Sequence, residues 1–250
     1  MTYSIVARDP DTGHLGIAVA SRFFAVGSLV PQIDGKVAVA SQAFVNPLWG
    51  VDGAAQMAEG LSAATVITGL AARDTFQSQR QAHMIDLEGR SAAHTGADCI
   101  DWAGHRIADG VSVAGNMLVG PAVVEDTLAA YLDHMDLPFA ERLLLAMEAG
   151  EAAGGDKRGK QAAALRIHRG EAFPWIDIRA DDHADPLAEL RRLLSVAGER
   201  ALFFADELGH SGSFSGRADR SILEAGIAKA EQDRAARGLS SQSFATNTDI

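Results

Sequence analysis

The sequence has little of what several classes of protein require. Its single cysteine, Cys99, excludes an internal disulfide framework and a cysteine-rich zinc site. Basic residues number 22 against 33 acidic ones, and the net charge of −11 argues against a nucleic-acid partner, because phosphate binding needs clustered Lys and Arg. No apolar run reaches the roughly 18 residues of a membrane span, and no secretory signal is recognisable. We therefore expect a cytoplasmic protein without a nucleic-acid or membrane partner.

Several familiar motifs are missing as well. The chain contains neither GxGxxG nor a Walker A loop, so a dinucleotide or P-loop site is not expected. It also lacks GxSxG, which argues against a hydrolase with a Ser-His-Asp triad on an α/β-hydrolase scaffold.

Glycine is abundant, with 25 residues, and 47% of the chain is hydrophobic, which suits close-packed sheets. Apolar patterns predict strands over residues 3–8, 15–21, 36–42, 82–87, 91–95, 111–116, 162–168 and 175–179. They predict helices over residues 52–72 and 219–237 and after Pro121, Pro138 and Asp185. This order predicts an α+β fold with mainly antiparallel sheets and helices outside. Residues 1–197 would form the main domain, and residues 198–250 a helical extension that is disordered from about residue 240.

Thr2 is the first candidate for catalysis. Removal of Met1 would place its hydroxyl and a free α-amine on one residue, directly before an alternating strand. An α-amine has a pKa of roughly 7.7–8.0 and can act as a general base near neutral pH. A threonine activated by its own N-terminal amine is a recognised nucleophile. The alternative is an ordinary strand residue.

Asn116 and Arg22 follow apolar strands directly. The Asn116 amide could stabilise an oxyanion, as could backbone amides between Gln42 and Asn46, although capping of a turn explains Asn116 equally well. Arg22 could bind a substrate carboxylate through two parallel hydrogen bonds. Its alternative is a structural ion pair with Asp181 or Asp182.

Two charged segments in the second half are further candidates. The glycine-rich loop at 154–159 contains Asp156 and Arg158 and is either a substrate-binding loop or a solvated turn. Asp182 and His183 are metal-ligand residue types, but neighbouring side chains on an extended chain point in alternate directions, and no further spaced His or Cys supports a metal site. We expect a hydrogen-bonding corner before the next helix and no bound metal.

Several segments resemble, in order and spacing, the family labelled domain of unknown function 1028, which is grouped with the N-terminal-nucleophile hydrolases. Six segments carry this resemblance, spread from the first strand to the start of the last helix of the main domain. They are SIVARDP (residues 4–10), GIAVASRF (16–23), AGH (103–105), GNMLVGP (115–121), EAGEAAGGDKRG (148–159) and DIRADDHADP (177–186). The resemblance covers about residues 2–195 and implies a four-layer αββα sandwich and hydrolysis of an amide bond.

The opening is also similar to proteasome-type β subunits, in which a threonine-led strand is followed by a Ser-Arg pair and then a lysine. The matching residues here are Thr2, Ser21, Arg22 and Lys36. By this likeness, the positive charge of Lys36 would lower the pKa of Thr2. One departure is Ala20, where those relatives carry the acidic residue that would hold the lysine in place.

The leading hypothesis is an amidohydrolase with Thr2 as nucleophile, Asn116 or a backbone amide as oxyanion donor, and no metal or organic cofactor. The substrate would be a small amide, and Arg22 favours one that bears a carboxylate. The substrate-binding residues of this hypothesis are Ser21, Arg22, Gln42, Asn46, Asp156, Arg158, Asp182 and His183.

Two rival hypotheses belong to other classes. One is a non-catalytic protein on the same fold that binds small acids near Arg22, Arg158 and His183. The other is an assembly module in which the helix at 219–237 serves as an oligomer arm. We expect a homo-oligomer, a dimer or larger.

Overall fold

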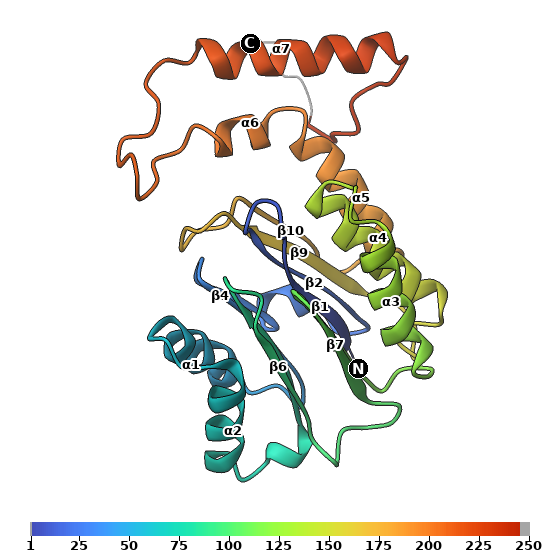
Figure 1. Ribbon diagram of the computed structural model, residues 1–250. Coiled ribbons are helices and arrows are strands. Elements are labelled where there is room, and N and C mark those ends of the chain that lie inside the picture. Colours follow the sequence, from blue (N-terminus) through green and yellow to red (C-terminus); the bar gives the residue numbers. More distant parts are fainter. Residues whose placement is uncertain (1, 246–250) are drawn as a thin grey trace.

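The computed structural model describes residues 2–245, and its centre is a pair of β-sheets packed face to face (Figure 1). Every strand pairing in both sheets is antiparallel. The larger sheet has the order β10 (Ile176–Ala180), β9 (Ala162–His168), β2 (Leu15–Ser21), β1 (Thr2–Arg8), β8 (Val111–Asn116) and β7 (Gly104–Ala108). The smaller sheet has the order β3 (Pro31–Ile33), β4 (Val37–Ala43), β5 (Arg80–Asp86) and β6 (Ser91–Thr95).

Helices cover the outer face of each sheet, which gives four layers in the order α-β-β-α (Figure 1). The smaller sheet packs against α1 (Pro47–Ala58) and α2 (Ala63–Arg73). The larger sheet packs against α3 (Ala122–Asp133), α4 (Phe139–Ala152) and α5 (Pro186–Ala197). The expected α+β sandwich of two antiparallel sheets is confirmed.

The first strand shows how alternation builds these layers. Tyr3 and Ile5 point outward into the core beneath α3 and α4. Ser4 and Val6 point inward, toward the smaller sheet. Since side chains alternate along a strand, Thr2 belongs to the inward set.

The single helix predicted over residues 52–72 is wrong, because the chain forms α1 and α2 there. Gly60 adopts a φ of +100°, which ends the first helix. Ser62 then caps the second by accepting a hydrogen bond from the Thr65 backbone amide at 3.2 Å. The apolar spacing ran through both helices because each places one face on the same sheet.

The sequence patterns did not predict two short strands, β3 and β7. No element was predicted over residues 96–110, but this segment contains β7, an edge strand whose residues are partly buried or exposed. β3 has three residues and pairs with β4 at the other sheet's edge. Both depend on pairing with a neighbouring strand, which is a long-range contact that local periodicity does not encode.

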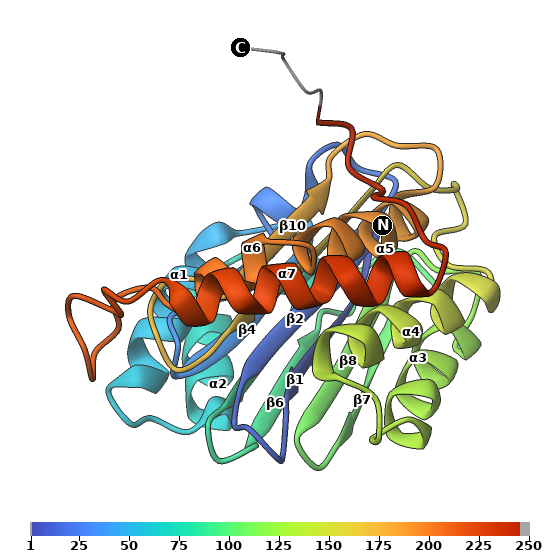
Figure 2. The same ribbon diagram turned by 90° about the horizontal axis from the view of Figure 1, so that it is seen from above.

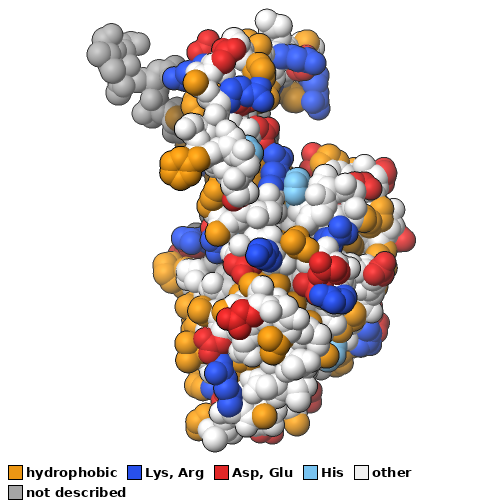
Figure 3. Space-filling view, turned by 60° about the vertical axis from the view of Figure 1, so that its left-hand side comes forward, with side chains coloured by type: hydrophobic (Ala, Val, Ile, Leu, Met, Phe, Trp, Pro, Cys, Tyr) orange, Lys and Arg blue, Asp and Glu red, His pale blue; other side chains and the backbone are white. Residues whose placement is uncertain are grey.

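The chain after α5 forms an extension on one side of the sandwich, with α6 (Ala201–Ala205) and α7 (Ser221–Ala236). Seen from above, α7 crosses the molecule over α5 and α6 (Figure 2). In the space-filling view the extension stands off from the main body, and charges of both signs are interspersed over the visible face (Figure 3). Leu223 is the one buried residue of α7.

The division at residue 197, the oligomer arm and the homo-oligomer stay predictions. Residues 246–250 of the expected disordered end lie outside the described residues. Within residues 2–245, no helix has the length and apolar character needed to cross a membrane.

A pair of glycines tests the packing of the outer helices. A Cβ at Gly150, in α4, would collide with Thr127 Oγ1 and lie 2.9 Å from Tyr3 Cε2. We expect Gly150→Ala to lower the free energy of unfolding by about 1–3 kcal/mol, because α4 must move away from both α3 and β1. Chemical denaturation measures this loss.

The matched control is Gly69→Ala in α2, where an added Cβ meets nothing within 4 Å. This substitution should raise stability by up to about 1 kcal/mol, since alanine is the better helix former. Equal effects of the two substitutions would contradict the close approach of α4 to β1.

Candidate functional site

The space between the sheets is apolar at one end and polar at the other. The apolar end contains residues such as Val6, Ile17, Ala38 and Ile85. At the polar end, six polar residues are each at most 3% exposed: Ser4, Gln42, Gln81, His83, Ser112 and Asn116. A buried polar group without a partner is costly, so their hydrogen bonds determine which arrangement is stable.

One chain of hydrogen bonds links these side chains. Ser4 Oγ donates to Gln42 Oε1 at 2.7 Å, which uses its only proton. His83 Nε2, 2.8 Å from Ser4 Oγ, must therefore donate to it, and His83 Nδ1 accepts from Ser112 Oγ at 3.0 Å. Gln42 Nε2 donates to Gln81 Oε1 at 2.9 Å. Burial lowers the pKa of His83 to about 3, with a smaller contribution from His105, so the ring is neutral.

Asn116 connects this network to Thr2. The two residues face each other across β1 and β8. The Asn116 amide nitrogen donates to Gln81 Oε1 at 3.0 Å and lies 3.5 Å from the carbonyl oxygen of Thr2. The structure therefore brings together two of the three predicted catalytic residues.

Thr2 itself lies at the start of β1 and is 6% exposed. Its hydroxyl donates to Ser21 Oγ, at the end of β2, with an oxygen-to-oxygen distance of 3.2 Å. Ser21, which the proteasome-like opening pointed out in the sequence, is thus within hydrogen-bond distance of Thr2.

Thr2 lines one cavity, and a second cavity shares Ala43 and Phe44 with it as a common wall. The first has a volume of about 230 Å³ and is lined by Thr2, Phe23, Val26, Leu29, Val30, Gln42, Ala43, Phe44 and Val45. The second has a volume of about 270 Å³ and is lined by Ala43, Phe44, Gln79, Asp98, Cys99, Ile100, Asn116 and Met117. Together they give room on both sides of a bond placed near Thr2.

Arg22, Asp156 and Arg158 form a second group beside Ser21. The buried Asp156 carboxylate accepts from the Arg22 backbone amide at 2.8 Å and from the Arg158 guanidinium at 3.2 Å. The Arg22 guanidinium donates to the Arg158 carbonyl oxygen at 2.6 Å. Asp156 thus holds the loop at 154–159 against the end of β2, and Arg22 forms no ion pair with Asp181 or Asp182.

Lys36 is not brought to the site. It lies exposed at the turn before β4, whereas Gln42, near Thr2, lies at the other end of that strand. Six residues of β-strand separate the two positions by about 20 Å. Because no charge acts strongly over that distance in water, Lys36 cannot lower the pKa of Thr2.

Asn46 has a structural role at the N-terminus of α1. Its side-chain oxygen accepts from the Leu48 backbone amide at 3.1 Å, and its amide donates to Asp74 at 3.1 Å. Asp74 Oδ2 also accepts from Trp49 Nε1 and Arg80 Nε. Burial alone would raise the pKa of Asp74, but these hydrogen bonds outweigh it and hold the pKa well below its usual range.

Asp182 and His183 lie on the surface near Arg22. Gln161 Nε2 donates to Asp182 at 3.1 Å, and the His183 backbone amide donates to the Gln161 carbonyl oxygen. This agrees with a hydrogen-bonding corner. An open cavity of about 370 Å³ there is lined by Arg22, Lys160, Gln161, Asp182, His183 and Ala184. Within residues 2–245, no three His, Cys, Asp or Glu side chains are grouped as a metal would require.

Sequence reasoning missed Ser4, Gln81, His83 and Ser112. All four are inward-facing strand positions, and the available signal was a polar residue on a strand face that also carries apolar residues such as Val6 and Ile85. Their meeting depends on how two sheets stack, which no single strand reveals.

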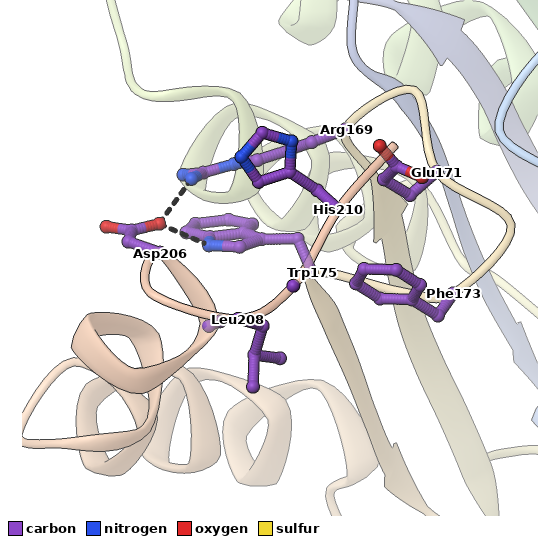
Figure 4. A pocket seen from close by; sticks show the side chains of 9 residues that line it. Arg169, Glu171, Phe173, Trp175, Asp206, Leu208 and His210 are labelled. Atoms are coloured by element: carbon purple, nitrogen blue, oxygen red, sulfur yellow. Dashed lines mark hydrogen bonds and ion pairs between the residues drawn. The ribbon is translucent and has the colours of Figure 1, made fainter. Parts of the chain in front are cut away.

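A further cavity, of about 250 Å³, lies between the sandwich and the extension (Figure 4). Asp206 forms an ion pair with Arg169 and accepts from Trp175 Nε1 at 3.1 Å. The Arg169 guanidinium lies 3.6 Å from the centre of the Trp175 ring. Because the polar groups of Asp206, Arg169 and Trp175 pair with one another, we interpret them as the contact that holds the extension on the sandwich.

The sequence from Thr2 onward matches the model of a family of unknown function, DUF1028, over residues 2–190. The chain belongs to the DUF1028 family. The crystal structure of protein SPO2555 from Silicibacter pomeroyi, also a DUF1028 protein, matches with a TM-score of 0.81 and 29% sequence identity. The match covers 87% of this chain and 99% of that one. No curated protein matches the sequence. The DUF1028 match begins at Thr2 and ends in α5, so it includes every residue of the polar network.

The buried His83 predicts a specific pH dependence of stability. Between pH 6.5 and 3 the unfolded chain binds a proton on this histidine that the folded protein does not, so stability falls as the pH is lowered. From pH 7 to pH 5 the loss assigned to His83 is about 2 kcal/mol. Denaturant unfolding at both pH values measures it.

His83→Gln is the control, because glutamine keeps a donor and an acceptor but does not titrate. Its unfolding free energy should depend less on pH than that of the unaltered protein, by the same 2 kcal/mol or so. Parallel pH dependences of the two proteins would show that His83 is not buried as a neutral ring.

Proposed function

We propose that the protein is an N-terminal-nucleophile amidohydrolase in which Thr2 cleaves a small amide or peptide-like bond. The observation that carries the proposal is the position of the Thr2 side chain. The Thr2 hydroxyl lies 3.2 Å from Ser21 Oγ at the polar end of the sandwich, the Asn116 amide nitrogen lies 3.5 Å from the Thr2 carbonyl oxygen, and Thr2 lines a cavity large enough for part of a small molecule.

The chemistry requires a chain that begins at Thr2. Thr2 Oγ attacks the carbonyl carbon of the amide, and the Thr2 amine takes the hydroxyl proton, directly or through water. When the C–N bond breaks, that proton passes to the leaving amine. Water then attacks the Thr2 ester, gives one proton back to Thr2 Oγ, and releases a carboxylic acid. The atoms balance without a metal or an organic cofactor.

Asn116 is the proposed oxyanion donor. Its amide nitrogen lies on the Thr2 side of the network, and its orientation is held by Gln81. A preorganised donor of this kind contributes roughly 10²–10³ in rate.

Backbone strain next to Thr2 supports the same location. Ala43 has a φ of +69° and Met117 a φ of +58°, a region that residues with a side chain rarely adopt. Each lines a cavity beside Thr2. Such conformations concentrate at functional sites, where surrounding structure stabilises them.

The rival function is binding of a small acid without catalysis. The observation in its favour is the open cavity lined by Arg22, Lys160 and His183. Lys160, however, lies 3.6 Å from both Glu151 and Asp185, which offset its charge.

The two functions differ in their need for a free amine on Thr2, since only hydrolysis requires it. We compare two chains: one begins at Thr2, verified by intact mass, and the other carries an uncleavable N-terminal extension. Both are assayed on a panel of small amides. The extended chain keeps the hydroxyl but lacks the amine base, so hydrolysis should fall by about 10²–10⁴. A C-terminal tag of equal length is the control.

The nucleophile is tested by Thr2→Ala and Thr2→Ser. The alanine variant should lose at least about 10³ in kcat/KM, whereas the serine variant, which keeps a hydroxyl, should retain measurable hydrolysis. Undiminished hydrolysis by Thr2→Ala, with an unchanged fold by circular dichroism, would refute the mechanism.

A further inference from the structure

We propose that the 230 Å³ cavity beside Thr2 binds an uncharged apolar group on the carbonyl side of the substrate, so that the site selects amides of apolar acids. This inference rests on the proposed function for its reaction, but its binding selectivity can be measured separately. It differs from the carboxylate-bearing substrate that Arg22 suggests in the sequence.

The lining of the cavity is the first argument. Apart from Thr2 and Gln42, every residue that lines it has a hydrocarbon side chain, and none is charged. Val26 and Val30 form its deep side, being 2% and 4% exposed, and belong to the apolar core between the sheets. The side-chain amide of Gln42 is already hydrogen-bonded, because its oxygen accepts from Ser4 and its nitrogen donates to Gln81.

The energetics follow from this lining. An apolar group gains free energy on entering, in proportion to the area it buries. A charged group would lose its hydration with no opposite charge in the lining to replace it. The cavity therefore discriminates by charge as well as by shape.

The volume sets the size of the group. An apolar cavity of about 150 Å³ accepts benzene, so 230 Å³ accommodates a phenyl ring or a branched aliphatic side chain with space to enter. Phe23 and Phe44, which are 53% and 65% exposed, add apolar walls at the rim.

The covalent step assigns the cavity to the acyl part of the substrate. After the C–N bond breaks, the acyl group stays bonded to Thr2, whereas the amine departs. Thr2 lines this cavity and not the neighbouring one, which is lined by Asn116 and Met117. The bonded fragment therefore occupies the Thr2 cavity, and the amine leaves past the other.

Arg22 does not reverse this selectivity. It is next to Phe23 in the chain, but it is not among the residues that line the cavity. Its guanidinium lies against the Arg158 carbonyl oxygen, on the side held by Asp156.

The test uses the full chain with Thr2→Ala, which prevents turnover, and NMR titration with three probes. The probes are the N-acetylated amides of phenylalanine, aspartate and lysine. We expect the phenylalanine probe to bind at least about tenfold more tightly than either charged probe. Equal binding of the three, or tighter binding of a charged probe, would overturn the proposal.

Two adjacent phenylalanines provide a matched pair in the same background. Phe23 lines the cavity, and Phe24 does not, although both are more than half exposed, at 53% and 63%. Phe23→Ala should weaken binding of the phenylalanine probe about three- to tenfold, and Phe24→Ala less than twofold. Equal effects would place the probe elsewhere.

Turnover by the chain that begins at an intact Thr2 is measured separately. Selective binding of the phenylalanine probe without hydrolysis of any amide would refute the amidohydrolase and leave the cavity assignment standing. Hydrolysis of small amides without selective binding of the phenylalanine probe would refute the cavity assignment and leave the amidohydrolase standing.

Discussion

The structure depends on the need to satisfy polar groups buried between two sheets. Displacing two close-packed apolar faces opens cavities, and amides and hydroxyls in addition lose their hydrogen bonds if they move. Ser4, Gln42, Gln81 and His83 fit together only when β1 and β8 lie over β4 and β5 in one register. Each missing bond would cost about 1–3 kcal/mol, so the polar end selects one register for the stacked sheets. The position of Thr2 is one result of that register.

A second hydrogen-bonded centre positions the other side of the site. Asp74 accepts from Asn46, Trp49 and Arg80, and Arg80 also donates to the Phe44 carbonyl oxygen. Through these bonds the partly buried Asp74 carboxylate connects α1, β5 and the segment after β4. That segment includes Phe44, which lines both cavities. The cavity walls are thus determined by groups that no substrate would contact.

The sequence was a good guide where structure is local. Alternating apolar residues located β1, β2, β8 and β9 within a residue or two, and proline marked the starts of α3 and α4. The hypothesis assigned Thr2 and Asn116 to one site, and the proteasome-like opening added Ser21; in the structure the three lie at the ends of neighbouring strands.

The features that the sequence did not predict share one physical cause: each depends on contacts with distant parts of the chain. Gly60 divides a helix whose apolar pattern continues on the far side of the break. Lys36 resembles a catalytic lysine in spacing, but β4 runs so that this residue ends at the opposite side of the sandwich. His83 is neutral because it is buried between the sheets, where Ser4 and Ser112 of the other sheet form hydrogen bonds with its ring. Such features follow from which sheets stack and in which direction.

The loose attachment of α7 gives the molecule two levels of stability. A helix of 16 residues that buries one leucine gains little from its contacts with the rest of the chain, so it opens with far less free energy than the strands. Amide protons of α7 therefore exchange with solvent through local opening, whereas those of β1 exchange only when the whole sandwich unfolds. The end of the chain can be cut by a protease or altered over evolutionary time without disturbing the sheets that hold Thr2.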